Sequence, residues 1–549
     1  MVIRLIPVIR SVRENRTVSH ERLLTFVLAG FVVLVMVRWV AERTGLPSAA
    51  LLTLAGIGYS LLPGQNVVLN PEFVLTYLIP PLLYSAALDS SLLAIRRNLV
   101  TVIGLSVLLV LITALTIGAG FAWFVGGATL AAGVTIGAAV APHDPGVALG
   151  VARRSGLPVR LVTVIQGEGL LNDATALTLL SVAITAAAGH GFSGPAALGR
   201  LLLAAAGGIV AGALVAYGVR RLRHLARDPL TANAISLATP FAAYLLAEWA
   251  GVSGVLAVVV TGLIVGHDAP RWASGASRLQ TSAVWRLVDF LLEGMIFLLI
   301  GQQLPAILRD LRQYDAAVIL PAVAVTVGVV LVSRPLWLLA THTLPARLGW
   351  RSGALTGREV IALSWTGTRG VISLVAVLAV PLTTVDGSPF PLRDLLVFCT
   401  LTAVLVTLLG QGLTLAPLVR LLGLHASPDD QAALRNEARS ASVHAALIRL
   451  GELGAQEPEL DPRQIAQMRE ALQVRLRRYE GRIESLRTTG AEIEGHAEGY
   501  ETRAWLRHVT IDAQREELLR WRDAGRLPDA GLRVLERELD HEERMLPPG

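Results

Sequence analysis

The stretch 138-AAVAPHDPGVALG-150 places an acid and a helix break inside an apolar segment of the chain. Pro142 and Pro145 flank His143 and Asp144, and each proline removes a backbone donor and disrupts an α-helix. In lipid, such a break is tolerated only where it is buried in protein or lines a water-filled cavity. An ionised carboxylate at that depth is costly, so its presence indicates a functional site. The stretch therefore predicts an interrupted membrane helix with an ion site near the bilayer midplane.

The composition of the whole chain also indicates a membrane protein. Of its 549 residues, 53% are hydrophobic and 16% are charged, whereas soluble domains carry roughly 25% charged residues. All 48 basic residues are arginines, so the net charge of +6 reflects arginine-rich loops and gives no reason to expect nucleic-acid binding. The single cysteine, Cys399, excludes an intrachain disulfide and is expected to be a small buried apolar residue.

Thirteen windows are apolar and long enough to be considered as spans, given that a crossing needs about 20 residues. They lie at 23–41, 47–63, 71–88, 99–124, 129–150, 159–187, 197–219, 231–250, 252–267, 284–304, 316–341, 359–381 and 394–420. The pair on either side of Gly251 could instead be one kinked helix. The sequence thus predicts an all-α membrane protein with about thirteen transmembrane helices, the count of windows above.

The arginines between these windows predict which loops are cytoplasmic. Seventeen arginines lie in or beside the odd-numbered connections and four in the even-numbered ones. Because cytoplasmic loops are enriched in Lys and Arg, the odd connections and everything after the last window are expected in the cytoplasm. The basic arm 1–22 disagrees, since thirteen spans place it outside. Either it is translocated regardless, or the true start codon lies further downstream.

Three parts of the chain differ in character. The arm 1–22 is basic, residues 23–424 form the expected transmembrane domain, and residues 425–549 are densely charged. In this last part, apolar residues recur at helical spacing, for example in 464-QIAQMREALQVRLRRYEGRIESLR-487. We expect a cytoplasmic helical tail, either a solvated accessory domain or a segment used in dimer contacts.

A second acidic run lies in the sixth window, 165-IQGEGLLNDATALTLL-180. Glu168 and Asn172 are four residues apart and share a helix face, whereas Asp173 is turned about 100° further round. Asp173 is therefore expected to face Asp144 at the interrupted helix. Two carboxylates and a few freed backbone carbonyls form an oxygen-rich site for a small cation such as Na⁺ or K⁺. A carboxylate that holds a proton and a cation in turn is enough for exchange.

Glu168 requires a partner, and the twelfth window supplies one. Arg369 lies within 363-LSWTGTRGVISLVAVLAV-380, beside glycines and threonines that loosen a helix. A lone buried arginine is costly, so pairing with Glu168 is expected. This pair is interpreted as orienting the site and not as binding ions.

These motifs resemble those of the monovalent cation/proton antiporters of the NhaP and sodium/hydrogen-exchanger type, in the bacterial subgroup with a hydrophilic tail. The matching pieces, in the family's order, are 79-IPPLLYSAAL-88, 141-APHDPGVAL-149, 167-GEGLLNDATAL-177, 244-YLLAEWAGVSGVLAVVVTGLIVG-266 and 365-WTGTRGVISLVAVLAVP-381. Together they cover most of residues 23–420.

The resemblance implies an inverted-repeat fold with the fifth and twelfth spans interrupted, a homodimer, and location in the inner (plasma) membrane. It implies that Asp173 carries the ion and the proton, that Asn172 and Asp144 are site partners, and that Glu168 and Arg369 form the bracing pair. His143, next to Asp144, is added as a candidate ion- or proton-binding residue. Asn at position 172 implies electroneutral exchange of one cation for one proton, in pH and cation homeostasis.

Three positions depart from the family pattern. Ser85 stands where many relatives carry Glu, Gly169 where many carry Ser, and His143 where many carry Thr. Each departure loses or changes an oxygen near the expected site, which favours a larger cation such as potassium, so sodium is not assured. His143 is interpreted either as a hydrogen-bonded scaffold residue or as a pH sensor.

Other acids and bases receive weaker assignments. Glu248, near the outer end of the eighth window, matches a family position and is either a site residue or a helix-packing acid. Glu293 is mid-span and unassigned, whereas Asp289 and Arg334 are expected near the cytoplasmic ends, within reach of solvent. No Gly-Lys-Ser/Thr motif or other phosphate-binding signature is present.

The chain is therefore not expected to be an enzyme or to use a cofactor, and an ion gradient should drive it. The alternatives to a sodium/proton antiporter are a potassium-preferring antiporter and a gated cation channel or sensor on the same scaffold.

Overall fold

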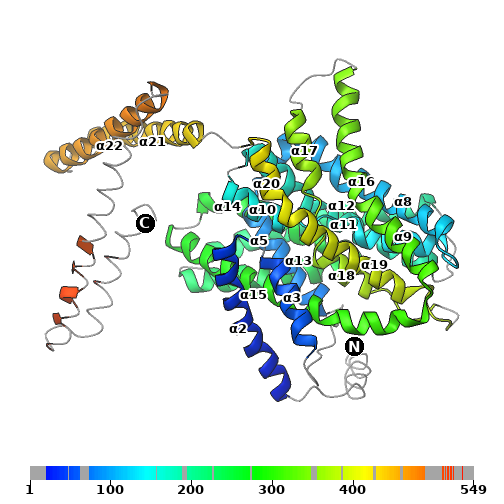
Figure 1. Cartoon of the computed structure of the whole chain (residues 1–549). Coiled ribbons are helices and arrows are strands. Elements are labelled where there is room, and N and C mark those ends of the chain that lie inside the picture. Colours follow the sequence, from blue (N-terminus) through cyan, green and yellow to red (C-terminus); the bar gives the residue numbers. More distant parts are fainter. Residues whose placement is uncertain are drawn as a thin grey trace. The chain divides into compact units, whose positions relative to one another are not determined.

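A computed structural model describes residues 20–46, 48–61, 73–155, 157–187, 194–225, 228–272, 275–347, 355–384, 387–424, 428–457 and 461–488, with scattered residues between 510 and 539. The chain divides into two compact units, Met1–Ala426 and Ser427–Gly549. Within the described residues both are helical, and the only β-type pairing is an isolated bridge between Thr383 and Pro389 (Figure 1). Most of the basic N-terminal arm and of the chain beyond residue 488 lies outside the described residues.

The first half of the large unit consists of single helices and one interrupted helix. In chain order these are α2 (His20–Thr44), α3 (Ser48–Ser60), η1 (Val74–Leu78) continuing into α5 (Ile79–Leu88), α6 (Leu92–Arg97), α7 (Leu99–Ile103) continuing through η2 (Gly104–Leu108) into α8 (Leu109–Phe124), α9 (Leu130–Val140), α10 (Gly146–Ser155) and α11 (Val159–Ala187).

The second half also contains long helices and one interrupted helix. Its elements are α12 (Gly194–Leu225), α13 (Pro229–Trp249), α14 (Gly254–Trp272), α15 (Gly275–Asp310), η3 (Leu311–Gln313), α16 (Ala316–Arg347), α17 (Gly357–Trp365), α18 (Val371–Leu378), α19 (Arg393–Val406), η4 (Thr407–Gln411) and α20 (Gly412–Leu421). The small unit contains α21 (Pro428–Gln456) and α22 (Pro462–Thr488), which pack against each other.

The thirteen apolar windows of the sequence all fall on these helices. The pair around Gly251 forms two helices, α13 and α14, joined by a turn in which Gly251 has a φ of +70°. Within the described residues, six helices are long and apolar enough to cross a membrane, and four shorter apolar helices accompany them. The number of crossings and the inverted repeat remain predictions.

Helix breaks occur at both predicted positions. α9 ends at Val140 and α10 begins at Gly146, while α17 ends at Trp365 and α18 begins at Val371. Both first half-helices begin at a threonine cap: the Thr129 hydroxyl accepts the Ala132 N–H at 3.1 Å, and Thr356 forms a capping box with Glu359. Each of these half-helices therefore has a capped N-terminus and ends a few turns later at the break.

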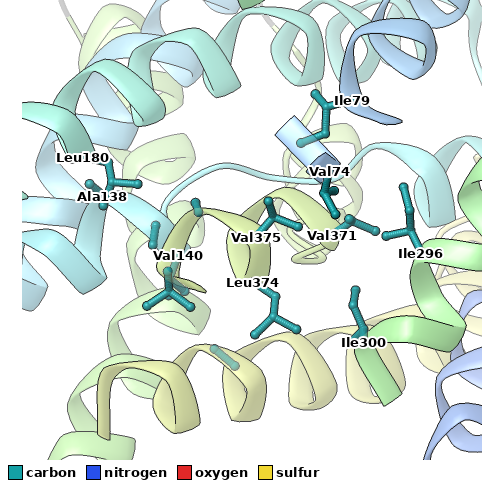
Figure 2. Close-up of a cluster of buried hydrophobic side chains, with 14 of the residues drawn as sticks. Val74, Ile79, Ala138, Val140, Leu180, Ile296, Ile300, Val371, Leu374 and Val375 are labelled. Atoms are coloured by element: carbon teal, nitrogen blue, oxygen red, sulfur yellow. The ribbon is translucent and has the colours of Figure 1, made fainter. Parts of the chain in front are cut away.

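α18 lies in the centre of the largest buried apolar cluster. Val371, Leu374 and Val375 of α18 gather with residues of η1, α5, α9, α11 and α15 (Figure 2). Leu374 and Val375 are fully buried. Packing of this kind fixes the short helix, since eight residues would be marginal on their own.

Close glycine contacts draw α3 and α15 together. A Cβ atom at Gly301 would collide with the backbone carbonyl oxygen of Thr53, and one at Gly56 would collide with that of Leu298. Small residues allow helix backbones to approach in membranes, where van der Waals packing drives association.

Gly301→Ala should lower the thermal midpoint of the purified protein in detergent. The added methyl group meets backbone atoms that cannot rotate away, and overpacking of this kind costs about 1–3 kcal/mol. Gly58→Ala in α3 is the control, because nothing lies within 4 Å of its Cβ position, and its midpoint should be unchanged or slightly higher. Equal thermal midpoints for the two variants would contradict the close contact between α3 and α15.

Candidate functional site

The two helix interruptions, residues 141–145 and residues 366–370, lie against each other and form a crossing. The backbone N–H of Asp144 donates to the carbonyl oxygen of Thr368 at 2.8 Å. The Thr368 hydroxyl donates to the carbonyl oxygen of Asp144 at 2.9 Å. Each break therefore supplies hydrogen-bonding partners for the other, which satisfies backbone groups that no helix pairs and no lipid could pair.

The Asp144 carboxylate lies at the N-terminal ends of two half-helices. The N–H of Gly146, the first residue of α10, donates to Asp144 Oδ1 at 2.8 Å. A side chain at Gly370, the N-cap of α18, would collide with Asp144 Oδ2, so that terminus also meets the carboxylate. Helix N-termini carry partial positive charge and exposed N–H donors. Both termini therefore present partial positive charge to the Asp144 carboxyl group.

Two arginines occupy the opposite, C-terminal ends. Arg369 Nη1 donates to the carbonyl oxygen of Ala141, the C-cap of α9, at 3.0 Å. Arg334 Nε donates to the carbonyl oxygen of Leu363, in the last turn of α17, at 2.7 Å. Cations stabilise the partial negative charge of a helix C-terminus. All four helix ends at the crossing are thus matched by a charge of opposite sign.

Glu168 pairs with Arg334, and the predicted pair of Glu168 with Arg369 is not formed. Arg334 Nη2 donates to Glu168 Oε2 at 2.9 Å, Nη1 donates to Oε1, and both side chains are 2% exposed. Arg334 was expected near solvent at the end of a span. It is buried because its guanidinium lies between Glu168 of α11 and the C-terminal end of α17.

Arg369 is fully buried, but it bonds to groups other than its predicted partner, Glu168. Besides the bond from its side chain to Ala141, its backbone N–H donates to the Thr407 hydroxyl at 2.9 Å. Thr407 begins η4, a single π-helical turn between α19 and α20, and such turns are frequent at functional sites. Arg369 thereby ties the second interruption to the last helix of the unit.

Asn172 and Asp173 lie at the crossing on α11. Asn172 is completely buried, and its Nδ2 donates to the carbonyl oxygen of His143 at 2.9 Å. Asp173 is 4% exposed and close enough to Asp144 for the two carboxylates to interact electrostatically, whereas Asp144 itself is partly exposed. Within the described residues, no protein hydrogen bond reaches the Asp173 carboxylate. The two acids are therefore neighbours with unlike surroundings.

His143 directs its ring at the buried ion pair. Its Nδ1 lies 3.3 Å from Glu168 Oε1, and its Nε2 lies 3.4 Å from the Cβ position of Gly367. Its side chain is 4% exposed. The side chain thus packs with Glu168, while its backbone carbonyl serves the Asn172 amide.

The remaining sequence candidates have partners elsewhere. The Ser85 hydroxyl donates to Asp289 Oδ2 at 2.5 Å, joining α5 to α15. Glu248 is exposed, with Oε1 2.9 Å from the Cβ position of Gly254. Gly169 is pressed against Pro145, whose Cγ lies 2.5 Å from its Cβ position, so a serine does not fit this packing. None of these contacts involves the carboxylate of Asp144 or Asp173.

Sequence reasoning missed three residues of the crossing. Arg334 had a visible signal, since it is an arginine near the middle of an apolar helix. Thr368 lies in a stretch already marked as loosened by glycine and threonine. Thr407 had no signal, because a threonine in an apolar helix usually bonds to its own backbone. Within the described residues, no group of three or more His, Cys, Asp or Glu side chains could hold a resident metal ion.

Glu168 and Arg334 should be energetically coupled. Removing either side chain leaves a buried charge without its partner, at a cost of about 3–5 kcal/mol. Glu168→Ala and Arg334→Ala should each lower the thermal midpoint strongly, and the double variant should lose much less than the two losses combined. The matched cycle pairs Glu168→Ala with Arg369→Ala and should show weaker coupling. Coupling that is stronger with Arg369 would contradict the observed pairing.

Comparison with known proteins shows which family the chain resembles. The family model described as the transmembrane part of the sodium/hydrogen exchangers matches residues 31–421. A protein of Mycobacterium bovis, named an uncharacterized Na⁺/H⁺ exchanger, is 35% identical over 550 residues, 97% of this chain and 98% of its own. A protein of Escherichia coli with the same description is 32% identical over 424 residues, 71% of this chain and 74% of its own.

A solved structure shares the fold. The sodium proton antiporter of Methanocaldococcus jannaschii aligns with a TM-score of 0.59 at 20% identity, over 73% of this chain and 100% of that chain. The interrupted helices, the acids at their crossing, the family match over most of the large unit and a relative of matching length all lead to one conclusion. The chain belongs to the sodium/hydrogen exchanger family and is a multi-pass membrane protein of the antiporter type.

Proposed function

We propose that this chain exchanges one monovalent cation for one proton at Asp144 and Asp173, with sodium as the first candidate cation. The observation that carries the proposal is the unlike environment of two neighbouring acids at the crossing. Asp144 accepts a backbone N–H and meets two helix N-termini, whereas Asp173 is nearly buried and receives no protein hydrogen bond within the described residues.

These environments suggest different tasks for the two acids. Asp144 is supported in its ionised form by the termini of α10 and α18. Asp173 has no such support, so it gains most by binding a proton or a cation. A cation that binds between the acids displaces the proton of Asp173, and a proton that returns expels the cation. This competition couples the two fluxes, and it predicts that protons inhibit cation binding as the pH falls.

The buried arginines would keep the crossing intact during transport. Alternating access in transporters of this type is mainly a rigid movement of one bundle against another around a fixed site. Arg334 joins α16, α17 and α11, and Arg369 joins α18, α9 and η4. We infer that they hold the two interrupted helices as one body, so that the ion site moves without being taken apart.

Potassium is the second candidate cation. Ser85 is bonded to Asp289, position 169 has no side chain, and His143 directs its ring at Glu168. None of the three positions that differ from the family therefore adds a side-chain oxygen to the two acids. A site with fewer protein oxygens holds a small cation less firmly and leaves it more of its water, which favours the larger ion.

Four further expectations belong to the same proposal. The protein would act as a homodimer in the inner membrane, with the unit after residue 426 in the cytoplasm, and would serve pH and cation homeostasis. The gated-channel alternative is not favoured, because the matching family and relatives are exchangers. The deciding measurement is proteoliposome transport with a pH-sensitive dye, in which sodium, potassium and lithium are added in turn.

Asp173→Asn should abolish exchange while leaving the protein folded and inserted. The amide is nearly isosteric with the carboxyl group but cannot release a proton, so the dye signal should fall to that of empty liposomes. The control is Asp310→Asn, at the exposed end of α15, which should transport as the unaltered protein does. Exchange at the normal rate in the Asp173 variant would refute the mechanism.

Exchange should be insensitive to membrane potential. If Asp173 is the only group that gives up its proton, one positive charge enters as one leaves, and Asn172 adds no titrating group. The test imposes a potassium–valinomycin potential on proteoliposomes while sodium-driven pH change is followed, or the converse pairing if potassium is the substrate. A rate that follows the voltage would show that a second proton moves, and Asp144 and His143 would be the groups to examine.

A further inference from the structure

The second helix of the small unit carries an excess of positive charge. α22 contains seven arginines and three glutamates, which gives it a net charge of +4. α21, with three arginines and four acids, has a net charge of −1. The proposed exchange does not involve the charge of α22, so the placement of its arginines has to be explained separately.

One face of α22 packs against α21. The half-buried side chains of this face are Ile465, Leu472, Leu476, Tyr479 and Ile483. Ile465 Cδ1 lies 3.3 Å from the Cβ position of Gly454. The Arg439 guanidinium lies 5.8 Å from the centre of the Tyr479 ring, near the other end of the pair. The two helices therefore run antiparallel, and this face of α22 is occupied within the unit.

An exposed stripe runs along α22 beside this packing face. We call it the arginine stripe, and it consists of Met468, Ala471, Arg475, Arg478 and Arg482. These positions are three or four residues apart, so they share one face of the helix. Met468 is 56% exposed, and Val474 at the border of the stripe is 45% exposed. Within the described residues, no ion pair forms at Arg475 or Arg478.

The acids of α22 lie on the other side of the helix. At about 100° per residue, Glu470, Glu480 and Glu484 are each turned by about 120° or more from the middle of the stripe. Arg469 and Arg477 lie on the side of these acids. The stripe therefore combines positive and apolar side chains with no acid among them. This pattern is typical of a helix that lies on an anionic membrane surface.

A membrane surface lies within reach of α22. α20, the last helix of the membrane unit, ends at Leu421, and α21 begins at Pro428. The six residues 422–427 between them span at most about 20 Å. A tethered helix binds at a high effective concentration, so a weak attraction is enough. The arginine distribution predicts that this surface is the cytoplasmic leaflet, which carries anionic lipids.

We propose that the arginine stripe of α22 docks on the anionic lipid headgroups of the cytoplasmic leaflet. Its guanidinium groups bond to lipid phosphates, for which their planar fork is well suited. Met468 and Val474 enter the boundary between the headgroups and the acyl chains. The position of the small unit then depends on lipid charge and on ionic strength, whichever cation the membrane unit exchanges.

The test uses the full-length protein in lipid nanodiscs, with Ala471→Cys carrying a fluorophore. The nanodiscs contain neutral phosphatidylcholine alone or a mixture with phosphatidylglycerol, and some lipids carry a quencher near the headgroup. The label should be quenched only when the anionic lipid is present. Gln473→Cys is the control, since it is exposed and turned by about 200° from position 471, and its label should not be quenched. The native thiol, Cys399, is fully buried and should stay unlabelled.

Two pairs of substitutions test the arginines in the labelled protein. Arg475→Gln combined with Arg478→Gln should remove most of the quenching, because each arginine near an anionic surface strengthens binding about fivefold. Arg469→Gln combined with Arg477→Gln removes the same charge from the other side of α22 and should leave most of the quenching in place.

A salt titration needs no arginine variant, so it also covers the case in which these variants do not fold. Raising the salt concentration from about 0.1 M to about 1 M shortens the screening length from about 10 Å to about 3 Å. The label at position 471 should then lose most of its quenching.

Four results would overturn the inference. Equal losses for the two arginine pairs would show a general attraction of the tail and no docking face. Equal quenching at positions 471 and 473 would do the same. Quenching that persists in neutral lipid or at high salt would show that lipid charge is not what holds the helix. A label at position 471 that is shielded from water but never quenched by lipid would show that protein, such as a second copy of this chain, covers the stripe.

Discussion

The backbone that two broken helices leave unpaired is the constraint on which this membrane unit depends. Within a bilayer, every N–H and C=O group must find a partner in the protein. The protein meets this requirement by laying one break against the other, so that Asp144 and Thr368 bond in both directions. A single break would need a separate set of partners. Two breaks that cross supply partners to each other, and they concentrate polar groups at one point.

At the crossing, each charged side chain has the sign that is favourable at the helix end it meets. The N-termini of α10 and α18 meet an acid, and the C-termini of α9 and α17 each meet an arginine. Placing these charges the other way round would oppose the helix dipoles within a medium that screens them poorly. The candidate site therefore contains two kinds of charged group. Asp144 and the two arginines lie against helix ends, whereas Asp173 receives no hydrogen bond from the protein within the described residues.

Glycine is as important to this arrangement as charge. Gly370 leaves room for the Asp144 carboxylate, Gly169 for Pro145, and Gly146 for the space between Asp144 and Glu293. In each case a side chain would occupy the position that a functional or neighbouring group now fills. The glycines therefore allow the interrupted helices, α11 and their neighbours to approach closely at the crossing.

The sequence by itself determined the helical class, the two breaks and the acids that lie at them. An apolar window of sufficient length indicates a membrane span, because the bilayer requires one. A proline or an acid inside such a window has a high energetic cost, so it marks a candidate site from the sequence alone. Only the tertiary structure decided the partners. Glu168 had two buried arginines within reach, and the sequence predicted Arg369, whereas the structure pairs it with Arg334. The choice depends on where α16 lies against α11 and α17, and helix positions follow from packing among distant segments.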